Sequence, residues 1–119
     1  MKRGLDELSI VMQDEGIEVR GEERGEMRVA QYTLPAGCDL SLFFEGMPDD
    51  ACPCDHWGIV IEGEIHLLYT DGTEEITRAG EFYYWPPSHT AWTETGVVFI
   101  TITPAAQERL VDEHLSAQA

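Results

Sequence analysis

The chain has 119 residues, of which 43% are hydrophobic and 25% are charged, a composition typical of one globular domain. Its 23 acidic residues outnumber its 7 lysines and arginines, so the formal net charge is −16 at pH 7. Such an acidic surface repels phosphate groups, which argues against nucleic acid and anionic membranes as partners. The shortage of Arg and Lys also argues against substrates that carry a phosphate or two carboxylates.

Short apolar segments alternate with turn signals along most of the chain. Residues 5–13 are expected to form a short helix that ends before Gly16, and residues 104–116 a C-terminal helix. Between them, turn signals such as Asp71-Gly72 separate segments with strand character. The expected strands cover residues 17–21, 27–34, 40–44, 54–62, 64–69, 74–78, 82–85 and 97–102.

The order of these elements predicts one all-β domain over residues 1–119. Many short strands at intervals of roughly 8–12 residues, with helices only at the two ends, are typical of a sandwich or barrel of antiparallel strands. The main part of this barrel is expected over residues 27–103. Because small barrels leave sheet edges open, and pairing of subunits covers such edges, we also expect a homodimer.

The cysteine count and the apolar segments bear on the cellular compartment. Three cysteines, two of them only two positions apart, form a poor disulfide framework and are compatible with thiol ligands. No apolar stretch approaches the roughly 20 residues of a membrane span, and the first residues lack the apolar segment of a signal peptide. We therefore expect a cytoplasmic protein.

The segment Cys-Pro-Cys-Asp-His-Trp-Gly carries the strongest functional signal. Side chains alternate between the two faces of an extended strand, so Cys52, Cys54, His56 and Gly58 share one face. Thiolate and imidazole are the ligands that zinc, iron and copper prefer in proteins. His89 follows a Pro-Pro loop and could complete such a site. Either cysteine alone is better explained as a small buried apolar residue, and it is the shared face with His56 that favours a ligand role.

Two stretches resemble the motifs of the cupin family of small β-barrels. The first family motif has the shape His-x-His, three or four residues, Glu, six residues, Gly. Gly63 resembles its final glycine, which places His56 at the position of the family's Glu ligand. Cys52 then stands at the position of the second His and Asp50 at that of the first. The His-x-His pair itself is missing from this chain.

The second family motif has the shape Gly, five residues, Pro-x-Gly, two residues, His. Gly80 and Pro86 match this spacing, Ser88 replaces the second Gly, and Ala91 stands where the family has its His. His89 lies two residues earlier. The resemblance covers about residues 44–102, and the cysteine-rich block is similar to that of a subgroup of small single-domain cupins.

The resemblance implies a cupin-type antiparallel β-barrel, or jelly roll, with short terminal helices. It also implies a divalent metal ion, zinc or iron, held by His56 and His89 together with Cys54 or Cys52. Which cysteine is a ligand stays open, with Cys54 the first choice.

The aromatic residues of the two motifs suggest a mostly apolar pocket. We expect Trp57, Tyr84 and Trp85 to line the mouth of the barrel. Gly58 is expected either to give clearance for a ligand beside His56 or to mark a bend in the strand.

Two functions fit this pattern. The first is a metal-dependent cupin enzyme that acts on a small, neutral or weakly charged molecule. The second is a cupin that binds a small ligand without turnover and without a functional metal. The sequence shows no further inward acid that could act as a base, so it leaves the choice between enzyme and binding protein open.

Overall fold

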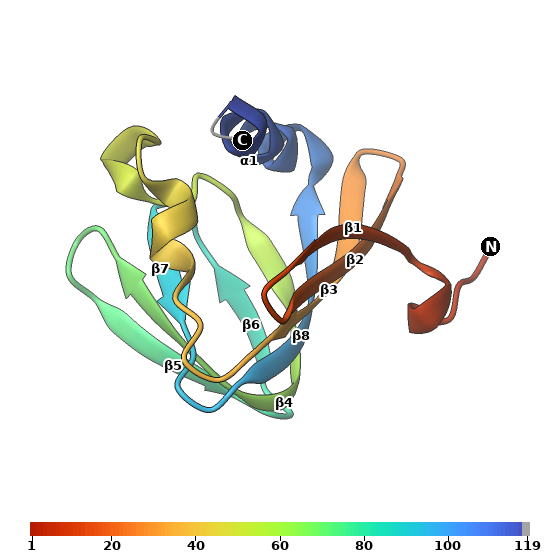
Figure 1. Ribbon diagram of the computed structural model, residues 1–119, viewed down its shortest axis with the longest axis horizontal. Helices are drawn as coiled ribbons and strands as arrows, with labels where there is room; N and C mark the ends of the chain where they lie inside the picture. The colour runs from red at the N-terminus through yellow and green to blue at the C-terminus, as the bar shows by residue number, and fades with distance from the viewer. Residues whose placement is uncertain (118–119) are drawn as a thin grey trace.

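The structure, a computed structural model, describes residues 1–117 and shows a strongly bent sheet of antiparallel strands with a helix at its C-terminal end (Figure 1). The strands are β1 (Ser9–Asp14), β2 (Ile17–Arg24), β3 (Met27–Leu34), β4 (His56–Tyr69), β5 (Glu74–Arg78), β6 (Phe82–Trp85), β7 (His89–Trp92) and β8 (Val97–Pro104). The helices are the short 3-10 helices η1 (Leu5–Glu7), η2 (Leu40–Phe44) and η3 (Pro48–Asp50) and the α-helix α1 (Ala105–Ala117). No helix in this part of the chain is long and apolar enough to cross a membrane.

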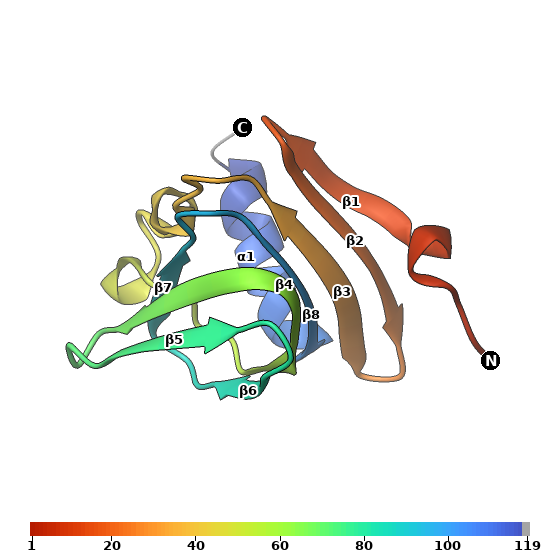
Figure 2. The same cartoon turned by 90° about the horizontal axis from the view of Figure 1, so that it is seen from below.

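Strand β4 connects the two halves of the sheet. The strand order is β1-β2-β3-β8-β4-β5, and β6 and β7 also pair with β4. The first half of β4 pairs with β6 and β8, whereas its second half pairs with β5 and β7. β1 and β5 lie at the two ends of this order and are not paired with each other. The predicted barrel is therefore an open sheet, compatible with a jelly roll, which bends around its core because β4 bends (Figure 2).

A bulge in the middle of β4 reverses which residues face the core. The pairing with β8 shifts its register between Val60 and Glu62. Gly63 follows with a φ of +74°, and a Cβ at this position would lie 2.1 Å from the carbonyl oxygen of Gly96. Only glycine fits such a close approach. Val60 is buried before the bulge and Ile65 after it, so the inward positions change from even to odd numbers.

Most of the predicted strands are confirmed. The ranges 27–34, 74–78 and 82–85 match β3, β5 and β6, and the predicted C-terminal helix matches α1 to within one residue at each end. The ranges 54–62 and 64–69 are one strand, β4, because the bulge continues the pairing across Gly63. β7 was missing from the prediction, and its pairing with the second half of β4 is what makes its four residues a strand.

Two predicted elements are wrong. The predicted helix over residues 5–13 is instead η1 followed by β1, because residues 9–14 pair along the edge of β2. The predicted strand over residues 40–44 is instead η2, and the Asp39 side chain caps it by accepting a hydrogen bond from the backbone N–H of Ser41.

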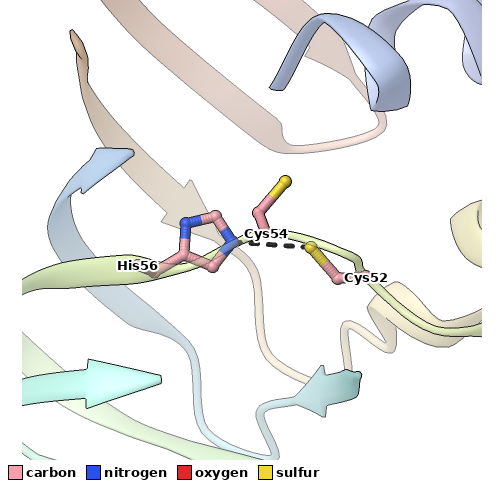
Figure 3. A group of neighbouring side chains, drawn as sticks. All are labelled: Cys52, Cys54 and His56. Atoms are coloured by element: carbon pink, nitrogen blue, oxygen red, sulfur yellow. Dashed lines mark hydrogen bonds between the residues drawn. The ribbon is translucent and has the colours of Figure 1, made fainter. Parts of the chain in front are cut away.

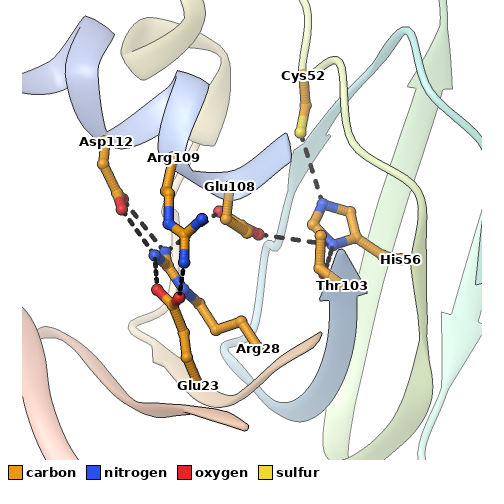
Figure 4. A network of polar contacts seen from close by, with 8 residues as sticks. All are labelled: Glu23, Arg28, Cys52, His56, Thr103, Glu108, Arg109 and Asp112. Carbon is orange, nitrogen blue, oxygen red and sulfur yellow. Dashed lines mark hydrogen bonds and ion pairs between the residues drawn. The ribbon is translucent and has the colours of Figure 1, made fainter. Parts of the chain in front are cut away.

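Helix α1 covers the end of the sheet at which β4 begins (Figure 1). Its Val111 packs against the buried cysteines that precede β4. Arg28 of β3 lies 2.7 Å from Glu23 and 2.8 Å from Asp112, and Arg109 also pairs with Glu23 (Figure 4). These ion pairs hold the helix against the β2–β3 hairpin, so α1 forms one wall of the site described next.

Candidate metal centre

Cys52, Cys54 and His56 gather at the start of β4 in the buried interior (Figure 3). One ligand atom of each lies within 4.8 Å of those of the other two. The Cys52 Sγ lies 3.5 Å from the Nε2 of His56. The three buried side chains alternate with the less buried Pro53 and Asp55, as the alternation of residues in the sequence predicts.

A short backbone bridge brings His89 to the same place. The N–H of Cys52 donates to the carbonyl of His89, and the N–H of Ser88 donates to the carbonyl of Cys52, each at 2.8 Å. His89 is buried, and the centroids of its ring and of the His56 ring lie 5.3 Å apart. The structure thus places together the four side chains that the sequence suggests as ligands.

Each imidazole is held through its Nδ1, which leaves Nε2 directed at the cluster. The His89 Nδ1–H donates to the carbonyl of Pro86 at 2.6 Å. The Nδ1 of His56 lies 2.6 Å from the Thr103 hydroxyl of β8 and 3.8 Å from Oε1 of Glu108 (Figure 4). Histidines that bind metals are commonly oriented in this way by a partner on the second nitrogen.

The electrostatics favour a thiolate at Cys52. The pKa of Cys52 is lowered because the Cys54 thiol donates a hydrogen bond to it and because His56 and His89 stabilise the negative charge. The same hydrogen bond, together with burial, raises the pKa of Cys54. Burial alone would lower the pKa of His56, but its contact with Cys52 and the negative charges of Cys52 and Glu108 outweigh burial and raise it.

Glu108 of α1 is a functional candidate that the sequence interpretation missed. It is only 6% exposed, and burial raises its pKa, although the positive charges of His56 and Arg28 oppose this shift. In a helix, residues three or four positions apart share a face, so its spacing from Ala105 and Val111 was a usable signal. The structure therefore supplies the inward acid that was not identified from the sequence.

The cluster opens into a cavity of about 70 Å³. Apolar and aromatic side chains form most of its wall, among them Phe44, Ile65, Trp85 and Phe99. Cys52, His56 and His89 line it, whereas Cys54 is fully buried behind them and does not. A space of this size holds a few water molecules, or an ion with a molecule of a few heavy atoms.

Three of the expected pocket residues have a different position. Trp57 and Tyr84 are corrected to the outer face of the sheet, where their rings stack at 5.0 Å. The reason is again alternation, since Trp57 follows the inward-facing His56. A Cβ on Gly58 would lie 1.9 Å from the carbonyl oxygen of Ile100. The missing side chain thus makes room for strand β8 and not for a ligand. Trp85, in contrast, does line the cavity.

Comparison with protein-family models finds no match for this sequence, and comparison with curated proteins finds none either. Solved structures do resemble it. An RmlC-like cupin from Shewanella frigidimarina has a TM-score of 0.59 at 21% identity, over 83% of this chain and 86% of that chain. The fold is that of the cupins.

Two further structures of the same fold have names that include a metal or a substrate. The structure of FeII HppE has a TM-score of 0.61 at 15% identity, over 87% of this chain and 59% of that chain. A variant of the oxalate decarboxylase OxdC from Bacillus subtilis has a TM-score of 0.60 at 13% identity, over 84% of this chain and 28% of that chain. Identities this low establish the cupin fold alone.

Proposed function

We propose that this cupin binds one zinc or iron ion through His56, His89 and Cys52, beside a small apolar cavity. The observation that carries the proposal is the convergence of these side chains in the buried interior, with Cys52 and His56 only 3.5 Å apart. Sulfur and imidazole ligands suit zinc and iron. The resemblance to FeII HppE supports the choice, because that structure has iron(II) in the same fold.

Cys52 replaces Cys54 as the preferred thiol ligand. Both imidazoles contact Cys52 and stabilise its thiolate, and only this cysteine lines the cavity. Cys54 donates a hydrogen bond to it, which is the role of a group that orients a ligand. Three protein ligands would leave a coordination position toward the cavity, which is the arrangement of catalytic metal sites. A metal there would act as a Lewis acid or redox centre.

The cavity also restricts the molecule that this site would take. Its small volume and largely apolar wall favour a molecule of a few heavy atoms. The net charge of −16 and the Glu108 carboxyl in the wall disfavour an anion. We therefore propose a small, neutral or weakly charged substrate or ligand.

Elemental analysis of protein purified without an affinity tag tests the metal. We expect a near-stoichiometric amount of zinc or iron in the wild type, and its loss in His56→Ala and Cys52→Ser, with retained far-ultraviolet circular dichroism. Cys54→Ser should keep the ion with weaker affinity. Cys38→Ser and His66→Ala are the matched controls, because neither residue lines the cavity.

A wild type without metal, or full retention of metal in His56→Ala, would contradict this proposal. The first outcome favours the alternative that the sequence also suggests, a cupin that binds a small ligand without a functional metal. In that case the thiol of Cys52 should react with iodoacetamide faster than that of Cys54, because its pKa is the lower of the two.

A further inference from the structure

Three polar side chains from different elements line the cavity beside the metal-binding cluster: Tyr32, Thr101 and Glu108. The buried Thr101 hydroxyl lies beside the hydroxyl of Tyr83, which donates to the carbonyl of Ile100, and Thr101 makes no well-formed hydrogen bond with the described residues. The buried Glu108 carboxyl has His56 and Arg28 as ion-pair partners at 3.8 and 3.9 Å. Tyr32 stacks on Phe99 in the same wall.

A hydroxyl such as that of Thr101 is unusual in a protein interior. Most buried polar groups have a hydrogen-bond partner, and leaving one without a partner costs about 1–3 kcal/mol. Tyr32 comes from β3, Thr101 from β8 and Glu108 from α1, and all three line the same cavity as Cys52, His56 and His89. Their common position in a mostly apolar wall points to a molecule with one polar group that these side chains contact.

We propose that Tyr32, Thr101 and Glu108 form a ligand subsite for the amino or hydroxyl group of a small molecule. A carboxyl oxygen accepts hydrogen bonds, and the two hydroxyls both donate and accept them. The apolar wall of the cavity contacts the hydrocarbon part of the same molecule. This inference deepens the proposed function, since the ligand would lie beside the ion, but the subsite itself does not require the ion.

Three-carbon probes that differ only at one end test the subsite. Chelator-treated, metal-free protein is titrated with propylamine, 1-propanol and propionate, and binding is followed by ¹H–¹⁵N chemical shifts. We expect propylamine and 1-propanol to bind and propionate to bind at least tenfold more weakly. Glu108→Gln should weaken the binding of propylamine at least tenfold, and Thr101→Val should weaken the binding of both propylamine and 1-propanol. Glu113→Gln, the same change at an exposed acid of α1 that does not line the cavity, should leave all three unchanged.

Equal binding of propylamine and propionate, no binding of any probe, or no effect of Glu108→Gln would overturn the subsite. Metal content, measured in the same variants, separates this outcome from failure of the metal centre. If the wild type purifies without metal and its probe binding depends on Glu108, the subsite proposal stands and the metal proposal is rejected. If the wild type purifies with metal but binds no probe after chelation, the metal proposal stands and the subsite proposal is rejected.

A second inference rests on the outer face of the sheet. Six large apolar side chains there are between 37% and 76% exposed. We call them the outer apolar face: Trp57, Ile59, Ile61, Phe82, Tyr84 and Ile102. They are contiguous, since Trp57 pairs with both Tyr84 and Ile102, and Ile59 pairs with Phe82. All six side chains are uncharged, although a quarter of the chain is charged, and the Tyr84 hydroxyl donates to the carboxylate of Asp55.

We propose that this face binds the same face of a second copy of the chain. The six side chains present roughly 500–600 Å² of exposed surface, if each offers about 200 Å² when fully exposed. Two such faces would bury about 1,000–1,200 Å² before the rim is added, which reaches the range of specific interfaces. Two sheets readily pack face to face, and a two-fold axis makes one patch its own partner.

Sedimentation tests this interface with charge-matched variants. We expect a dimer at micromolar concentration, and a monomer for both Ile59→Glu and Phe82→Glu. Val11→Glu on β1 is the control, because it adds the same charge at an exposed apolar position outside this face. Because each copy carries −16, dimerisation should become tighter as salt increases. A monomeric wild type at 100 µM, or dimers that persist in Ile59→Glu, would overturn the inference.

Discussion

Alternate residues in the first half of β4 face two different environments. Inward, His56 and Val60 are buried, and Gly58 lies against the backbone of β8. Outward, Trp57 and Ile59 are more than a third exposed. Both sets are mostly apolar, so the strand lacks the apolar-in, polar-out pattern of a sheet with one wet face. A run of apolar residues is instead typical of a strand buried on both sides. This pattern is the one expected if the outer face packs against the second copy proposed above.

The largest expected effect is a loss of stability at Gly58, which faces inward, compared with its outward-facing neighbour Ile59. Gly58→Ala should reduce the free energy of unfolding by about 3 kcal/mol or more, because its Cβ would overlap the Ile100 carbonyl, and neither backbone can yield easily. Ile59→Ala should cost less than about 1 kcal/mol per monomer. Urea unfolding at low protein concentration measures both. Equal losses in the two variants would mean that the inner face is no more tightly packed than the outer one.

Two neighbours on β8, the inward Thr103 and the outward Ile102, allow the same comparison of the two faces by metal affinity. Thr103→Val removes the hydroxyl that lies 2.6 Å from Nδ1 of His56, and we expect the metal affinity to fall by about 10- to 100-fold. Ile102→Thr changes the adjacent outward residue and should leave metal affinity unchanged. Competition with a chromophoric chelator reports both values. An unchanged affinity in Thr103→Val would show that Glu108, and not the hydroxyl, orients the imidazole.

As the pH falls, the inner face should lose stability first, because the ion pairs that hold α1 against the sheet weaken. Hydrogen bonds from Arg28 and Arg109 lower the pKa of Glu23, so its contribution to stability is present above the ordinary carboxyl pKa and is lost as the pH falls through the lowered value. Hydrogen exchange measured from pH 6 to pH 3 should show loss of protection in α1 before β4 and β8. In Glu23→Gln, the backbone amides of α1 should exchange at pH 6 as fast as those of the wild type do at acid pH. Simultaneous loss in all elements would contradict this order.

The smallest effect is expected on the outer face of the monomer. Phe82→Ser exposes no core atom, since this side chain is already 76% exposed, and should change the free energy of unfolding by less than about 0.5 kcal/mol at nanomolar protein. At high micromolar protein the same variant should be less stable than the wild type, because it lacks the stabilisation of the dimer. Thermal unfolding at two concentrations measures the difference. The same melting temperature for wild type and variant at both concentrations would argue against a self-associating face.

Local alternation accounts for the part of the site that the sequence could predict. Cys52, Cys54 and His56 lie on an extended segment, where the direction of each side chain depends on its neighbours alone. The same rule places Trp57 outward, so its assignment to the pocket was wrong and could have been avoided. Leu110 is the first large apolar residue of the C-terminal helix, yet it is exposed, whereas Glu108 faces inward. The rotation of a helix about its axis depends on what it packs against, and a helix with so few apolar residues leaves that rotation open.

The sequence by itself determined the cupin fold, most of the strands and the row of metal-binding side chain types, because turn signals and strand alternation are local properties. Only the tertiary structure decided that the backbone of Cys52 pairs with that of His89, which sets two distant histidines 5.3 Å apart. It also decided that α1 brings Glu108 to the same cavity, through ion pairs with β2 and β3. These contacts join residues far apart in the chain, and their geometry follows from the bend of β4 and the packing of the helix.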